Sequence, residues 1–142
     1  MKLAATTLSL LLLLSFSACK HHHHEEAEEK GPDYEKRLKK AEMQVDEIME
    51  MMDLPEYGLV KLSKEGQYLS KDYLQAATDM IKHGRRMKDV DYPDKKFLKL
   101  NDKMLQAFDV FESALKTRNA DQIKKGWEAV ALSCKKCHDI YD

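Results

Sequence analysis

The chain has no large excess of charge of either sign and no second long apolar run, and both absences limit what it can be. Its 142 residues hold 24 Lys and Arg against 25 Asp and Glu, so its net charge indicates neither nucleic acid nor an acidic lipid surface as a partner. After the first 18 residues, no stretch approaches the roughly 20 apolar residues that a membrane-spanning helix needs. The sequence also lacks a nucleophile–base pair, paired buried carboxylates and a phosphate-binding glycine loop, so it does not predict an enzyme.

Cysteine is scarce, and two of the three cysteines lie in the run Cys134-Lys135-Lys136-Cys137-His138. The C-x-x-C-H spacing is that of covalent haem attachment. Two thiols one helical turn apart reach the two vinyl groups of one porphyrin edge, and the adjacent imidazole becomes an axial ligand of the iron. We therefore expect one haem c, with thioether bonds to Cys134 and Cys137 and with His138 as the proximal iron ligand.

The same run is also compatible with a structural zinc half-site, a redox dithiol or a chance occurrence. Zinc would need two more ligands at comparable spacing, and the folded part of the chain has no second C-x-x-C or H-x-x-x-H pair. A redox dithiol normally opens a helix after a strand, whereas this pair lies near the end of an expected helix. Haem attachment is the interpretation that uses all three side chains.

Residues 1–18 have the features of an export signal. Met1-Lys2 is a short basic start, Leu8–Leu14 is an apolar segment, and small residues precede a cysteine. This ending is similar to a bacterial lipoprotein signal that is cleaved before Cys19 and carries lipid on its thiol. The expected location is the periplasmic side of a bacterial membrane, where haem c is also assembled.

An ordinary signal peptide cut near Ala18 is the alternative, because Phe16 stands where lipoprotein signals usually have Leu. Cysteine usage favours lipidation. With Cys134 and Cys137 bonded to haem, Cys19 would otherwise be an unpaired thiol in an oxidising compartment. The membrane is then contacted through this lipid anchor only.

Residues 19–33 have no apolar period and predict a polar, His- and Glu-rich tether between the lipid and the folded domain. The four histidines His21 to His24 offer ligands for a transition metal. A metal-handling lipoprotein is therefore an outside alternative, although a solvated spacer is the simpler interpretation.

Residues 34–142 predict a single all-α domain with four helices, interrupted at Pro55, at Asp91–Pro93 and at Arg118–Asn119. Pro93 is expected to open the third helix, and Asn119 is expected to cap the fourth in a capping box with Gln122. Each expected helix has an apolar seam. The first two seams are, in the first helix, Leu38, Ala41, Val45, Ile48 and Met52, and in the second, Leu69, Tyr73, Ala76, Met80, His83 and Met87. The other two are, in the third helix, Phe97, Leu100, Met104, Phe108, Phe111 and Leu115, and in the fourth, Ile123, Trp127, Val130, Cys134, Cys137 and Tyr141. Because both haem cysteines fall on an apolar seam, we expect an up-down-up-down four-helix bundle with the haem between facing helices.

The last helix resembles the C-terminal block of the cytochrome c prime and cytochrome c-556 family. The similarity is strongest over residues 133–141, and Asn119-Ala120-Asp121 followed by Trp127 resembles the approach to that block. It implies a class II c-type cytochrome that exchanges single electrons with periplasmic redox proteins, and it leaves a homodimer open. Asp142 departs from the basic residue common in the family after the tyrosine.

The family uses a residue of the first helix at the sixth iron position. Aligning Arg37 with the arginine of that helix puts Ala41 and Val45 over the iron, which would leave the iron open. Met43 lies at the right level and offers a thioether, although it lies about 200° round the helix from both. His83, beside Gly84 on the second helix, is another candidate, but it is more simply a buried core histidine.

Two functions follow for a haem protein of this kind. With a distal ligand such as Met43, the chain is an electron carrier, and the basic cluster between Lys82 and Lys99 could contact an acidic redox partner. With an open iron, the chain instead binds nitric oxide or carbon monoxide in an apolar pocket beside the first helix.

Overall fold

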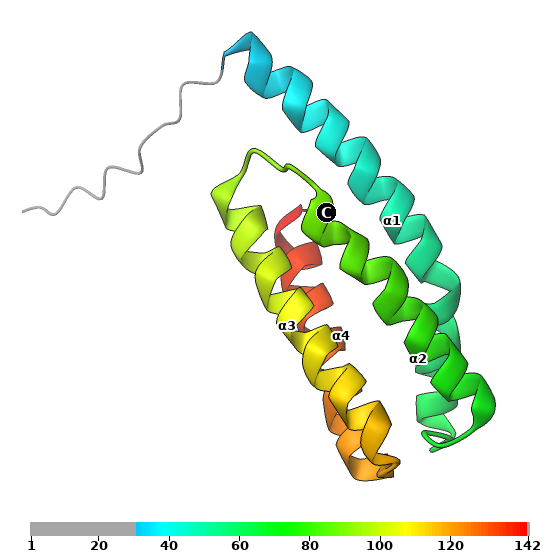
Figure 1. Ribbon diagram of the computed structural model, residues 1–142. Coiled ribbons are helices and arrows are strands. Elements are labelled where there is room, and N and C mark those ends of the chain that lie inside the picture. The colour runs from blue at the N-terminus through cyan, green and yellow to red at the C-terminus, as the bar shows by residue number, and fades with distance from the viewer. Residues whose placement is uncertain (1–30, 142) are drawn as a thin grey trace, which may run out of the picture.

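The computed structural model describes residues 31–141, and this part of the chain is helical with no strand (Figure 1). Its elements are α1 (Pro32–Lys64), α2 (Lys71–Gly84), the short 3-10 helix η1 (Arg85–Asp89), α3 (Lys95–Thr117) and α4 (Ala120–Tyr141). The prediction of an all-α fold is confirmed. The signal segment, Cys19 and His21 to His24 lie outside the described residues, so those predictions remain predictions.

α1 does not end at Pro55 as predicted, and it runs for 33 residues with this proline inside it. An interior proline removes one backbone hydrogen bond and costs about 3 kcal/mol. The prediction was wrong because the apolar face continues beyond the proline: Leu59 is completely buried and Leu62 packs against the core. The start was also misplaced by two residues, because Pro32 occupies the first turn, where its missing N–H costs nothing.

Side-chain caps define where the other three helices begin. The Ser70 hydroxyl accepts from the Tyr73 amide at 3.1 Å, the Asp94 carboxylate accepts from the Lys96 amide at 2.7 Å, and the Asn119 side chain accepts from the Gln122 amide at 3.0 Å. The Asn119 cap is therefore confirmed. Pro93 precedes the cap of α3, so its predicted place as the first residue of that helix was wrong.

The helices pack as two hairpins, α1 with α2 and α3 with α4, which η1 and the following loop connect (Figure 1). Two glycines allow close approach. A Cβ on Gly126 of α4 would lie 3.0 Å from the Cα of Phe111 in α3, and a Cβ on Gly84 at the end of α2 would overlap the ring of Phe108. The hairpins therefore approach closely between α2 and α3, whereas the backbones of α1 and α4 lie farther apart, with side chains of both helices lining the space between them.

The predicted apolar seams form the core, and its largest completely buried side chains include Tyr73, Phe108 and Phe111. Leu69 is an exception at 49% exposed, because α2 begins only at Lys71 and leaves it in a turn. No helix within residues 31–141 is long and apolar enough to cross a membrane.

Candidate functional site

The space between α1 and the second half of α4 holds a cavity of about 380 Å³, within the range of roughly 300 to 1,000 Å³ that is usual for ligand pockets. The connection between α2 and α3 contributes to its wall. It is lined by Glu42, Val45, Asp46, Met49, Met52, Met87, Tyr92, Phe97, Met104, Cys134, Cys137, His138 and Tyr141. The three side chains of the C-x-x-C-H run thus share one largely apolar cavity.

α4 brings these three side chains onto one face because it stays helical through the whole run. At 100° per residue, Cys137 lies about 60° round the helix from Cys134, and His138 lies about 40° on the other side of Cys134. The two thiols are one turn apart along the axis. This face therefore offers two sulfur atoms and an imidazole to the same group in the cavity.

Burial controls the chemistry of Cys134. Loss of water around the thiol raises its pKa to about 11, and the nearby Glu56 carboxylate adds to this shift. Redox-active dithiols have the opposite property, because they work through a thiol whose pKa is lowered. The environment of Cys134 therefore argues against the redox-dithiol alternative.

A zinc site is also disfavoured by the arrangement of donors. Among residues 31–141, no group of three or more His, Cys, Asp and Glu side chains is placed to hold a metal ion. Glu42 and Asp46 line the cavity with Cys134, Cys137 and His138, but the five do not converge on one point. A structural zinc site requires four such donors around one ion.

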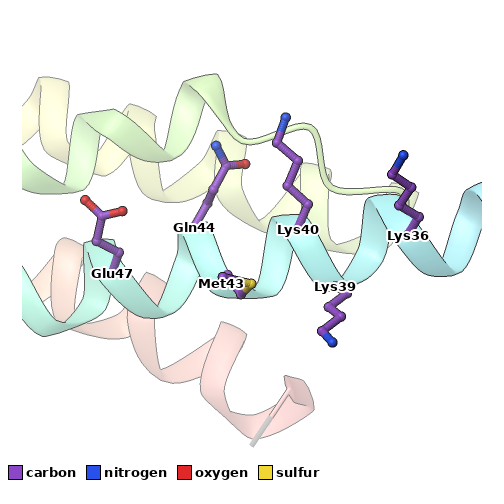
Figure 2. A pocket seen from close by; sticks show the side chains of 6 residues that line it. All are labelled: Lys36, Lys39, Lys40, Met43, Gln44 and Glu47. Carbon is purple, nitrogen blue, oxygen red and sulfur yellow. The ribbon is translucent and has the colours of Figure 1, made fainter.

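The structure places Met43 away from this cavity. Its side chain is 66% exposed, and it lies in a separate shallow groove on the outer face of α1 with Lys36, Lys39, Lys40, Gln44 and Glu47 (Figure 2). A ligand of iron next to His138 would have to lie on the cavity side of α1. The position of Met43 agrees with the helical wheel, which turned it away from Ala41 and Val45, and gives no support to Met43 as a distal ligand.

Met49 of α1 lines the cavity one turn after Val45. The sequence did not predict Met49 as a residue of the distal side. Val45, which the sequence placed on the distal side, also lines the cavity. Ala41 is packed in the core at 1% exposed and is not a cavity residue. The cavity lies further along α1 than the alignment through Arg37 suggested, and this difference in level brings Met49 within the site.

Four methionine side chains line the cavity: Met49, Met52, Met87 and Met104. They come from α1, η1 and α3, so thioethers surround the space from several directions. A methionine side chain is apolar and flexible and can also ligate iron. The cavity can therefore hold a flat apolar group and offer it a soft axial ligand.

Three aromatic rings line the cavity near the end of α4. Tyr92 stacks on Phe97 with the ring centroids 3.9 Å apart, and Tyr141 meets the Phe97 ring edge to face at 5.5 Å. Burial and the neighbouring Glu42 and Asp94 carboxylates raise the pKa of Tyr92. This end of the cavity is consequently lined by neutral aromatic side chains.

Two further candidates lie elsewhere. His83 does not line the cavity, and the neighbouring Gly84 faces the Phe108 ring instead of open space for a cofactor. Trp127 is buried and packs against Phe111 with the ring centroids 6.0 Å apart. Trp127 thus has a role in packing, whereas His83 is half-buried and not the buried core histidine that the sequence predicted.

Part of the basic cluster is already paired within the molecule. Arg85 binds the Asp109 and Glu112 carboxylates at 2.7 Å each, and Arg86 binds Glu47 of α1 at 3.0 Å. The surface available to an acidic partner is therefore smaller than the sequence suggested.

No family model, curated protein or solved structure matches the chain. The function must consequently be argued from the residues of the cavity and their geometry.

Proposed function

We propose that this chain is an extracytoplasmic monohaem c-type cytochrome, an up-down-up-down four-helix bundle that transfers single electrons. The observation that supports this most strongly is that Cys134, Cys137 and His138, on one face of α4, all line a single, largely apolar cavity. No other common use of two cysteines at this spacing needs the adjacent histidine.

The donor set fits haem c. Each thiol can add across a vinyl group, so that a carbon–sulfur bond forms while the thiol hydrogen moves to the neighbouring vinyl carbon, and no oxidant is needed. Cys134 and Cys137 would form these two thioethers, and a ring nitrogen of His138 would be the proximal ligand. When bound, haem supplies an iron centre that accepts and releases one electron.

The walls of the cavity suit electron transfer. Met52, Met87 and Met104 and the rings of Tyr92 and Phe97 would exclude water from the group, and a low local polarity is one of the means by which proteins set a haem potential. Met49 offers a thioether from α1 in the cavity that His138 lines from α4. This placement favours a six-coordinate electron carrier over a gas-binding protein.

The test is to produce the full chain in a periplasm that attaches haem c and to record the spectrum of the purified protein. We expect a reduced spectrum with the sharp bands of a low-spin c-type haem, and a haem-staining band that survives denaturation in a reducing agent, because thioether bonds persist there. A colourless wild-type protein that carries zinc would refute the proposal. A high-spin reduced spectrum that shifts at once with carbon monoxide would favour the gas-binding alternative.

We also propose that the protein is held at the periplasmic side of a bacterial membrane by lipid on Cys19. Cys19→Ala should move the protein from the membrane fraction to the soluble fraction or block its processing, because acyl chains supply the apolar burial that a charged tether lacks. Fractionation followed by haem staining measures this directly. A wild-type protein that is fully soluble and cut near Ala18 would show that the ordinary signal peptide is correct.

A further inference from the structure

The half of α4 that carries the C-x-x-C-H run is poorly anchored by burial. The buried residues of this helix are Ile123, Gly126, Trp127 and Val130, and none of residues 131–141 is fully buried. A helix end with few buried contacts opens easily. A different contact must therefore hold the end in place if His138 is to keep one orientation.

One carboxylate joins this end to α3. The Tyr141 hydroxyl donates to Oδ2 of Asp94 at 2.6 Å. The other oxygen of Asp94, Oδ1, accepts from the Lys96 amide at 2.7 Å and from the Phe97 amide at 3.4 Å, which caps α3. The last turn of α4 and the first turn of α3 thus share one charged acceptor.

The electrostatics agrees with this geometry. Partial burial alone would raise the pKa of Asp94, but the hydrogen bonds from Tyr141 and from the two amides outweigh burial and hold the pKa below its usual value. Burial, together with the hydrogen bond to Asp94, raises the pKa of Tyr141, so its hydroxyl stays protonated and able to donate. Hydrogen bonds to a charged acceptor are among the stronger ones in proteins.

Ring packing supports the same contact. The Tyr141 ring meets Phe97 at 81° with centroids 5.5 Å apart, and it meets Tyr92 at 73° with centroids 6.3 Å apart. All three rings line the cavity that His138 also lines. His138 precedes Tyr141 by three residues, close to one helical turn, so a displacement of Tyr141 would turn the imidazole as well.

We propose that Asp94 and Tyr141 form a latch that positions His138: the hydrogen bond fixes the last turn of α4 against the start of α3 and so fixes the direction of the imidazole. This inference rests on the proposed function, because it assigns the imidazole an iron to face. Tyr141 and Asp94 act through His138 and are positioning residues.

The test compares Tyr141→Phe with a control in the haem-loaded protein. Tyr141→Phe keeps the ring and removes only the hydroxyl. Lys135→Gln is the matched control, because it removes the 2.7 Å contact between Lys135 and Asp139 at the same helix end without touching α3. For Tyr141→Phe, we expect amide hydrogen exchange in residues 138–141 to accelerate about tenfold, as for the loss of a charged hydrogen bond. For the control, we expect about a twofold change or less.

A second measurement separates positioning from general loosening of the helix end. The paramagnetically shifted proton signals of the His138 ring in the oxidised protein report the direction of the imidazole. They should move or split in Tyr141→Phe and stay in place in Lys135→Gln. If Tyr141→Phe matches the control in both measurements, the latch is refuted.

Asp94→Ser provides an independent check, because serine still caps a helix but its shorter side chain does not reach Tyr141. It should reproduce the effects of Tyr141→Phe on residues 138–141. If it alters only the first turn of α3, the latch is refuted as well. A chain that never acquires haem would overturn the proposed function, and the exchange comparison would then decide separately whether Asp94 holds the end of α4.

Discussion

Replacing both Cys134 and Cys137 with serine is expected to abolish the haem-staining band completely. The two thiols are the only sulfur atoms on the cavity face of α4 in the described chain, so no other side chain of this helix can form a thioether with a group beside His138. The measurement is haem staining after denaturing electrophoresis, together with the intact mass of the wild-type protein and of the variant.

Single variants and a neighbouring residue make this experiment specific. Cys134→Ser and Cys137→Ser alone should each keep one covalent bond and therefore a reduced but visible band. Ser133→Ala is the matched control, because it changes the residue next to Cys134 but removes no sulfur, and the hydroxyl that it removes donates to the Val130 carbonyl within α4 at 2.7 Å. A double variant that still stains, or a control that does not, would contradict the assignment of the two thiols.

The second large effect is expected at Met49. Met49→Ala should convert a low-spin haem spectrum to a high-spin one and allow the reduced protein to bind carbon monoxide, because the thioether on the α1 side of the cavity is lost. Axial ligands set haem potentials over a range of about 0.8 V, so we expect the midpoint potential to fall by on the order of 100 mV. Optical spectra and a redox titration measure both changes.

Met43→Ala is the matched control on the same helix. Its side chain is 66% exposed in the outer groove, so its removal should leave the spectrum and the potential almost unchanged. If Met43→Ala alone produced the high-spin form, our placement of the distal side would be wrong. If neither variant changed the spectrum and the wild type bound carbon monoxide at once, the open-iron alternative beside Val45 would be correct.

The fold was largely predictable because apolar periodicity determines which helix faces must be buried. Ile48, Met80, Phe108 and Val130 were expected in the core, and all four are buried. The cap at Asn119 was predictable for a similar reason, since the hydrogen bond of its side chain to the Gln122 amide depends on local sequence alone.

The distal side of the cavity was not predictable, because it depends on how α1 lies along α4. The helical wheel correctly turned Met43 away from the seam, but it contains no information about axial position. That position is a tertiary property, because α1 packs mainly on α2 and reaches α4 only across the cavity. The continuation of α1 through Pro55 likewise depends on tertiary burial of Leu59, which outweighs a local preference.

The uneven contact between the two hairpins has a mechanical consequence. Gly84 and Phe108 hold α2 close to α3, whereas the backbones of α1 and α4 are farther apart and meet across the cavity through side chains. A haem in this space would be bonded covalently to α4, and side chains such as Met49 and Val45 would be its contacts with α1. A change in the side chains that α1 offers to such a group would therefore leave Cys134, Cys137 and His138 in place on α4.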